Sequence, residues 1–257
     1  MAVIQGVDYS FDHPTPAELK QAGKKFACRY VYPQSQNPGT KNLTRTEANA
    51  LKAAGIEIVS NYESYAGRAA DGRPAGITDA KAADIQHLAC GGRGTAPIYF
   101  SVDYDTTPSN YPAIDGYFKG VASVLGLARV GVYGEYDLVK HLMDSGLVGK
   151  SADAGKYYCW QTYAWSAGKY DERCALAQDK NGVKLGSGTV DLDSAHCTDY
   201  GQWGWKAPVK PPAKKPPAKP KGVEVAKAGD AHLILWDSGD LTVRKGGKHL
   251  YTVARGK

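Results

Sequence analysis

Residues 97–105, PIYFSVDYD, form an apolar run typical of a buried strand, and the run ends in two acids, Asp103 and Asp105. A helical pattern over residues 78–89 precedes this run, and a second helical pattern over residues 112–125 follows it and ends before Gly126. A strand between two helices is the repeating unit of sheets with parallel strands. This stretch therefore predicts an α/β fold with acidic residues at the carboxyl end of one strand.

The same alternation extends toward both ends of the chain. Strands are predicted over residues 3–9, 25–32, 57–62 and 129–133, and helices over residues 15–23, 44–54 and 136–144. Helix-start signals support these boundaries, because Pro16 follows Thr15. In the next helix Thr44 and Glu47 have the spacing of a capping box, and Gly55 marks its end.

Beyond residue 150 the predicted helices become short. Three further strands are predicted over residues 156–165, 174–178 and 188–193, joined by polar and Gly-rich loops. Eight strands within residues 1–205 predict a small TIM-like (β/α)₈ barrel with degenerate last helices, because right-handed crossovers leave few other topologies. An open, doubly wound sheet is the alternative, although no GxGxxG pattern follows the first strand.

Two different segments follow the barrel. Residues 206–221, KAPVKPPAKKPPAKPK, hold six prolines and six lysines, a composition that predicts an extended linker because it cannot bury a core. Residues 222–257 contain three alternating runs, which predict a small β module built as a three-stranded meander. Such a short module has a weak core, so we expect it to pair with a second copy or to dock on a partner.

The formal net charge of +6 lies in the linker, where no acid accompanies the lysines. Residues 1–205 hold 20 Lys and Arg against 22 Asp and Glu, so the predicted barrel is slightly acidic. We expect no nucleic-acid partner, because the linker lacks interleaved aromatic residues that stack on bases. No apolar run approaches the roughly 18 residues of a membrane span, and the first ten residues, MAVIQGVDYS, lack the features of a signal peptide. We therefore expect neither membrane insertion nor a secretion signal.

Cysteine and histidine spacing gives no metal or cofactor motif. The five cysteines are widely spaced without a CxxC pair, so most are expected to be buried and unpaired, with a Cys159–Cys174 bridge left open. The six histidines show no HExxH or other closely spaced ligand pair. Cys90 precedes GGRG, which we interpret as a helix end at Gly91. We expect no metal and no cofactor.

Acidic residues instead gather at the ends of the predicted strands. The carboxylates in question are Asp8, Asp103, Asp105, Glu135, Asp191 and Asp193. Residues two apart on a strand share a face, so Asp103 and Asp105 are expected to point together. Two carboxylates held close repel each other, and this raises the pKa of one while the other stays ionised. Glycosidases need that arrangement, although a lone Asp after a strand is more often a helix cap, as Asp12 and Asp193 could be.

Tyrosine and tryptophan gather near the same strand ends. Their flat apolar faces with polar edges suit a wet carbohydrate groove, and sugars stack on such rings. About half of these side chains are expected to fill the core instead.

Together these motifs resemble a known family. VDYS, FSVDYD, VGVYGEY, WQTYAWS and TVDLDSA follow one another along residues 1–205 as in an actinobacterial glycoside-hydrolase-like barrel family once classed as a domain of unknown function. That family is similar to the glycoside hydrolase family 25 lysozymes, which cleave the β-1,4 bond between N-acetylmuramic acid and N-acetylglucosamine. The resemblance implies a peptidoglycan hydrolase of muramidase type.

The resemblance also implies roles for individual residues. Family 25 carries Asp-x-Glu on the fourth strand, where this chain has Asp103 and Asp105, so Asp105 is the expected general acid. The pKa of Asp105 would be raised by Asp103 and by partial burial. Glu135 on the next strand is a reserve candidate, and Asp103 or Asp191 would act as nucleophile, orient the acetamido group or activate water.

The remaining expected contacts are to the sugar. Asp8 and Gln161 would form hydrogen bonds to it, and Tyr133 and Trp160 would stack on it. The same resemblance suggests a phage endolysin that waits in the host cytoplasm and reaches the wall once the membrane is breached. The LILWDSGDLTV run resembles one bulb-lectin repeat, so the C-terminal module is expected either to bind the wall or to form oligomers. The alternative function is a barrel that binds glycan without cleaving it, tethered to a phage or cell-surface assembly.

Overall fold

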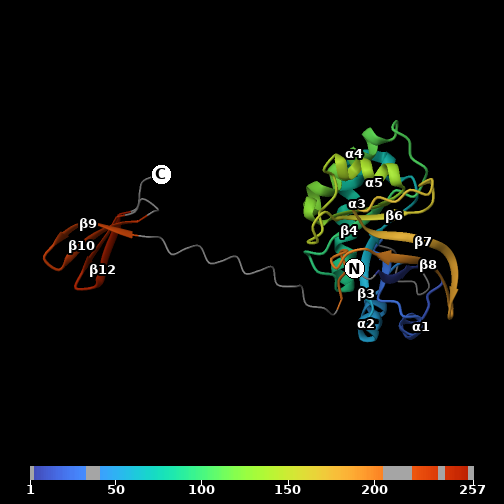
Figure 1. Cartoon of the computed structure of the whole chain (residues 1–257), viewed down its shortest axis with the longest axis horizontal. Coiled ribbons are helices and arrows are strands. Elements are labelled where there is room, and N and C mark those ends of the chain that lie inside the picture. The colour runs from blue at the N-terminus through green and yellow to red at the C-terminus, as the bar shows by residue number, and fades with distance from the viewer. Residues whose placement is uncertain (1–2, 33–40, 205–221, 237–240, 254–257) are drawn as a thin grey trace. The chain divides into compact units, whose positions relative to one another are not determined.

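The computed structural model describes residues 3–32, 41–204, 222–236 and 241–253. By its contacts the chain divides into two compact units, Met1–Lys206 and Ala207–Lys257. Figure 1 shows each unit with many of its helices and strands labelled. The predicted linker, residues 206–221, lies outside the described residues, so its extended conformation stays a prediction.

The first unit is a closed barrel of eight strands that follow one another in chain order, which confirms the predicted architecture. The strands are β1 (Ile4–Asp8), β2 (Phe26–Tyr30), β3 (Glu57–Tyr62), β4 (Ile98–Ser101), β5 (Val130–Gly134), β6 (Tyr157–Thr162), β7 (Cys174–Leu185) and β8 (Gly188–Ala195). Neighbouring strands from β1 to β7 pair in parallel. Their carboxyl ends therefore meet at one mouth of the barrel.

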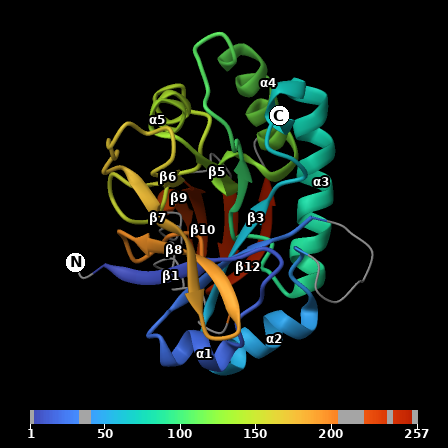
Figure 2. The same ribbon diagram turned by 90° about the vertical axis from the view of Figure 1, so that its right-hand side faces the viewer.

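The last strand departs from this rule. β8 is antiparallel to both β7 and β1, so the expectation of an entirely parallel sheet is wrong at this position. The physical reason is the connection: Leu185 pairs with Gly188, which leaves only Gly186 and Ser187 to form the turn, and so short a loop joins only antiparallel strands. Figure 2 shows this long β7–β8 hairpin beside α1. The direction of β8 brings the early part of that strand, rather than its carboxyl end, to the mouth.

Helices lie between the parallel strands and end after β5, as predicted. They are α1 (Pro16–Gln21), α2 (Arg45–Ala54), the 3₁₀ turn η1 (Arg68–Asp71), α3 (Gly72–Cys90), α4 (Tyr111–Leu125), η2 (Leu127–Arg129) and α5 (Tyr136–Asp144). The complete capping box is at Thr15 and Glu18 rather than at Thr44. Thr44 still caps α2, but the Glu47 side chain turns away to bind the buried guanidinium of Arg29 at 2.7 Å.

The packing of α3 on α4 depends on a backbone contact. A Cβ atom on Gly76 would lie 2.0 Å from the carbonyl oxygen of Tyr117, so only glycine fits between these helices. At the same interface the buried Asp79 accepts hydrogen bonds from Arg68 and from the Tyr117 hydroxyl. All five cysteines are buried and free, so Cys159 and Cys174 do not form a bridge.

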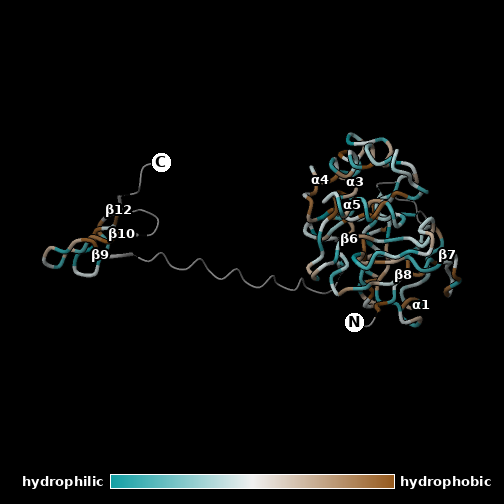
Figure 3. The backbone as a smooth tube through the Cα atoms, turned by 45° about the horizontal axis from the view of Figure 1, so that its top comes forward, coloured by the Kyte–Doolittle hydropathy of each residue, from teal (hydrophilic) through white to brown (hydrophobic). Residues whose placement is uncertain are grey.

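The second unit is a four-stranded antiparallel sheet in the order β12-β11-β10-β9. Its strands are β9 (Gly222–Ala228), β10 (Ala231–Trp236), β11 (Leu241–Lys245) and β12 (Lys248–Val253). The expectation of a three-stranded meander is wrong, because the sheet has a fourth strand, β9, which contains the Val-x-Val alternation after the linker. Figure 3 shows hydrophobic and hydrophilic residues interleaved along this sheet. Among the described residues, no helix is long and apolar enough to cross a membrane.

Candidate active site

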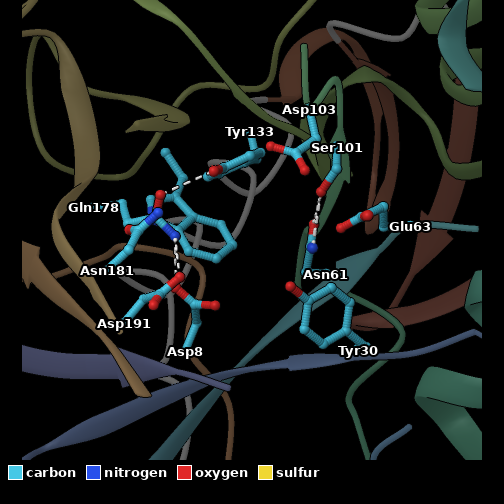
Figure 4. A pocket seen from close by; sticks show the side chains of 11 residues that line it. Asp8, Tyr30, Asn61, Glu63, Ser101, Asp103, Tyr133, Gln178, Asn181 and Asp191 are labelled. Carbon is cyan, nitrogen blue, oxygen red and sulfur yellow. Dashed lines mark hydrogen bonds between the residues drawn. The ribbon is translucent and has the colours of Figure 1, made fainter. Parts of the chain in front are cut away.

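A polar pocket of about 110 Å³ opens at the mouth of the barrel. The residues that line it are Asp8, Tyr30, Asn61, Glu63, Ser101, Asp103, Tyr133, Trp160, Gln178, Asn181 and Asp191. Figure 4 shows two acids on each side: Asp8 beside Asp191, and Glu63 near Asp103. Each of these carboxyl groups comes from a different strand or from the residues just after it, so the barrel itself brings them together.

Asp8 and Asp191 form the first pair. Asp8 is the last residue of β1 and lies directly opposite Asp191 on β8. Burial, and then the neighbouring charge of Asp191, raise the pKa of Asp8 to about 7. Burial also raises the pKa of Asp191, although the backbone N–H of Gly182 donates to its carboxylate at 2.8 Å and opposes that rise. Asp8 is the more deeply buried of the two, so the proton of the pair is favoured on Asp8 and the negative charge on Asp191.

Gln178 on β7 holds this pair in place. Its Nε2 donates to Asp8 at 2.9 Å and to Asp191 at 3.3 Å. Its Oε1 accepts from the hydroxyl groups of Tyr133 and Thr162, each at 2.9 Å. All four hydrogen-bonding positions of the amide are occupied, which fixes both its orientation and that of its partners.

Glu63 and Asp103 form the second pair, on the opposite wall. Burial raises the pKa of both carboxyl groups, and the nearby ammonium of Lys41 opposes the rise in each. The Nζ atom of Lys41 lies 3.1 Å from the Oε1 atom of Glu63. Behind them Asn61 and Ser101 exchange hydrogen bonds at 2.9 and 3.1 Å, and these fix the ends of β3 and β4. This wall of the pocket therefore carries two partly buried carboxyl groups.

Asp193 lies below this pocket and not in it. The side chain is completely buried inside the barrel, where the indole N–H of Trp160 donates to it at 3.0 Å. Burial, followed by the charge of Asp8, holds the pKa of Asp193 well above its usual range. Burial thus favours the neutral form of Asp193, which is neither the helix cap nor the turn residue that its sequence position suggested.

Three of the expected site residues lie outside the pocket. Asp105 is exposed and does not line it, because β4 ends at Ser101 and the strand alternation reaches Asp103 but not Asp105. Glu135 is buried as the N-cap of α5, where it accepts from the backbone N–H groups of Asp137 and Leu138. Its carboxylate also accepts from Thr106 at 2.6 Å.

Gln161 is the third of these residues, and its side chain forms hydrogen bonds to the loop that follows β6. Its amide donates to the carbonyl of Lys169 at 2.8 Å and accepts from the backbone N–H of Asp171 at 2.9 Å. Of the expected stacking residues, Trp160 is 1% exposed and packs edge-on against Tyr133 with ring centroids 4.6 Å apart. Trp160 therefore supports the pocket floor, while Tyr133 presents its hydroxyl to Gln178.

Several lining residues were missed at the sequence level. Glu63 had a usable signal, because it comes directly after the strand predicted over residues 57–62. Gln178 had one as well, because it ends the strand predicted over residues 174–178, where it pairs with Thr162 on β6. Asn181 had none, because it lies in the exposed, polar extension of β7 beyond that predicted strand. Among the residues that the structure describes, no three His, Cys, Asp or Glu side chains converge where a metal ion could bind.

Known proteins share this fold and much of this sequence. The family model described as "Rv2525c-like, glycoside hydrolase-like domain" matches residues 17–197. A curated protein of Mycobacterium tuberculosis, "Putative peptidoglycan hydrolase Rv2525c", is 31% identical over 211 residues, which cover 77% of this chain and 82% of that protein. The crystal structure of the Tat-secreted M. tuberculosis protein Rv2525c in complex with L-tartrate has a TM-score of 0.72 at 28% identity, covering 79% of this chain and 100% of that chain.

A more distant structure shares the fold alone. The modular autolysin LytC from Streptococcus pneumoniae has a TM-score of 0.51 at 13% identity, covering 75% of this chain and 46% of that chain.

These relatives correct one expectation and establish the family. The expected origin, a phage lysin held in the host cytoplasm, is wrong, because the related mycobacterial protein is Tat-secreted, which points to export across the membrane. The family model spans well over half of the chain, and the mycobacterial relative agrees with it. The chain belongs to the Rv2525c-like family of glycoside hydrolase-like domains.

Proposed function

We propose that this protein is an exported peptidoglycan hydrolase of muramidase type, which cleaves the β-1,4 bond between N-acetylmuramic acid and N-acetylglucosamine. One observation carries the proposal: four carboxyl groups from four strands face one another across a single pocket, and the pKa of each is raised. Glycoside hydrolysis needs one protonated acid to release the leaving group and one ionised carboxylate to support the cationic sugar. The name of the mycobacterial relative and its secretion agree with this function.

Asp103 is the proposed proton donor, in place of Asp105. It lies at the rim of the pocket, two residues past the last residue of β4, with a half-buried carboxyl group. Burial raises its pKa, so the carboxyl group keeps its proton closer to neutral pH than an exposed aspartic acid would. A donor with such a pKa transfers its proton efficiently to the leaving oxygen.

Asp191 is the proposed carboxylate on the opposite wall. The N–H of Gly182 stabilises its ionised form, while Asp8 holds the proton of the pair. Its negative charge faces the position where the oxocarbenium-like sugar would develop, as nucleophile, as base for water or as partner of the acetamido group. Asp8 then binds a sugar hydroxyl.

The test is product analysis of purified peptidoglycan after incubation with the full chain. Reduction with borohydride followed by mass spectrometry should show new reducing ends on muramic acid. New ends on glucosamine would refute the muramidase assignment. An intact glycan that nevertheless retains the protein would favour the alternative of a binding barrel without catalysis.

Matched variants test the assignment of the acid. Asp103→Asn should lower kcat at least 100-fold, within the usual range for loss of a general acid. Asp105→Asn is the control, because it makes the same chemical change two residues away on an exposed side chain. If Asp105→Asn abolishes cleavage and Asp103→Asn does not, the proton donor is Asp105.

A further inference from the structure

A second cavity of about 360 Å³ continues from the pocket. It shares Asp8, Tyr30 and Asp191 with the pocket and extends along residues 9–12, after β1, to Thr189 on β8. We call this cavity the β1 groove. Its volume lies in the range of cavities that bind small ligands, roughly 300–1,000 Å³. The β1 groove therefore has room for a sugar ring next to the pocket.

One large apolar side chain on the groove is uncovered. Phe11 lines the β1 groove with its side chain 65% exposed. A lone exposed apolar residue needs no explanation, but this one borders a cavity that shares three lining residues with the acidic pocket. The axial C–H groups of a β-linked pyranose form a flat apolar face that fits against a phenyl ring.

The segment that carries Phe11 is held firmly on both sides. The buried guanidinium of Arg29 donates to the carbonyl of Tyr9 and stacks on its ring, 4.1 Å from the centroid. The Tyr9 hydroxyl donates to Glu47 at 3.0 Å, and the ring nitrogen of His13 bonds the carbonyl of Ser10 at 2.7 Å. The phenyl ring is therefore presented on a preformed backbone, which lowers the entropic cost of binding.

The charge of the groove selects the class of sugar. Among the described residues, those that line it include three carboxyl groups, from Asp8, Asp12 and Asp191, and no lysine, arginine or histidine, whereas the ammonium of Lys41 lies beside Glu63 at the pocket. Carboxyl groups accept hydrogen bonds from sugar hydroxyls, and an ionised one, as proposed for Asp191, also repels an anionic substituent. Muramic acid carries a lactyl carboxylate, whereas N-acetylglucosamine is neutral.

We propose that the β1 groove is a sugar-binding subsite for a neutral N-acetylglucosamine ring, with Phe11 as its stacking surface. This inference rests on the proposed function, because it places the second ring of the same glycan. It adds a direction to that glycan, with the neutral ring toward β1 and β8.

Binding can be measured separately from cleavage. The probe is the β-1,4-linked tetramer of N-acetylglucosamine, titrated by calorimetry into the full chain carrying Asp103→Asn, because Asp103 does not line the β1 groove. Adding Phe11→Ala should raise Kd about tenfold, equivalent to about 1.4 kcal/mol. Phe11→Tyr should retain binding. Ile85→Ala is the control, since Ile85 is 68% exposed on α3 and borders neither cavity.

The outcomes separate this inference from the proposed function. An unchanged Kd in Phe11→Ala, or an equal loss in Ile85→Ala, would overturn the subsite. Tighter, salt-sensitive binding of the deacetylated glucosamine tetramer would overturn the assignment of a neutral sugar. If the wild-type chain binds the tetramer through Phe11 but leaves peptidoglycan intact, the subsite stands and the hydrolase assignment fails.

Discussion

Replacing Asp8 by Asn should make the barrel more stable above pH 7 and less active. Asp8 is 4% exposed, and its pKa rises from 3.8 to about 7 on folding. Because the folded pKa lies above the unfolded one, the wild-type protein loses stability as the pH rises from about 4 to about 7. At 1.36 kcal/mol per pKa unit, the loss approaches about 4 kcal/mol as an upper limit.

Asparagine removes the ionisation and keeps the shape of the side chain. Its carbonyl oxygen can still accept from Gln178, which donates to Asp8 in the wild-type protein at 2.9 Å. Below pH 4 the two proteins should be nearly equally stable, because Asp8 is then protonated in both folded and unfolded states. Above pH 7 the variant should be more stable by about 2–4 kcal/mol, or about 10 °C in Tm for a domain of this size.

Denaturant unfolding at pH 4, 5.5, 7 and 8.5 measures this difference directly. Asp105→Asn is the matched control, because it makes the same chemical change on an exposed side chain outside the pocket. Activity on peptidoglycan should fall in Asp8→Asn at every pH. Parallel pH curves for wild type and Asp8→Asn would refute the reasoning, because they would mean that Asp8 ionises equally well in the folded barrel.

Three further changes test other parts of the structure. Gln178→Leu should lower kcat at least tenfold, because Asp8 and Asp191 lose their shared donor; kinetics on peptidoglycan would show this, and an unchanged kcat would contradict it. Glu135→Ala should lower the free energy of unfolding by about 1–2 kcal/mol through loss of the α5 cap while kcat is kept; a kcat that collapses in Glu135→Gln would identify Glu135 as an acid instead. Gly76→Ala should cost about 1–3 kcal/mol by overpacking α3 on α4, visible as a lower Tm, whereas Gly94→Ala, which meets no atom closer than 4.0 Å, should change Tm little.

The barrel could be predicted because each of its parts has a local signal. The strand predicted over residues 57–62 is β3 over the same residues, and Thr15 and Gly55 mark helix ends where the structure has them. Acids that follow such runs were found in the same way, so the positions of Asp8 and Asp103 at the mouth could be anticipated. These features depend on neighbours in sequence, which is the information that a single sequence holds.

The errors arise where a long-range contact decides the outcome. Glu47 has the spacing of a capping box, but the buried charge of Arg29 binds its carboxylate instead. Asp105 has the spacing to share a face with Asp103, but β4 ends at Ser101 and the chain turns away before residue 105. Glu135 follows its strand as Asp8 does, yet the N–H groups of α5 take its carboxylate.

The antiparallel pairing of β8 with β1 has a consequence for how the chain folds. Ile4 pairs with Ala195 and Asp8 with Asp191, so the first strand completes its hydrogen bonding only with the last one. During synthesis from the N-terminus, one edge of β1 stays open until β8 has left the ribosome, and the acids at the mouth assemble only then. Contacts so distant in sequence slow folding and expose strand edges. A chain truncated before residue 188 would retain that open edge permanently, and its pocket would lack Asp191, the acid that faces Asp8.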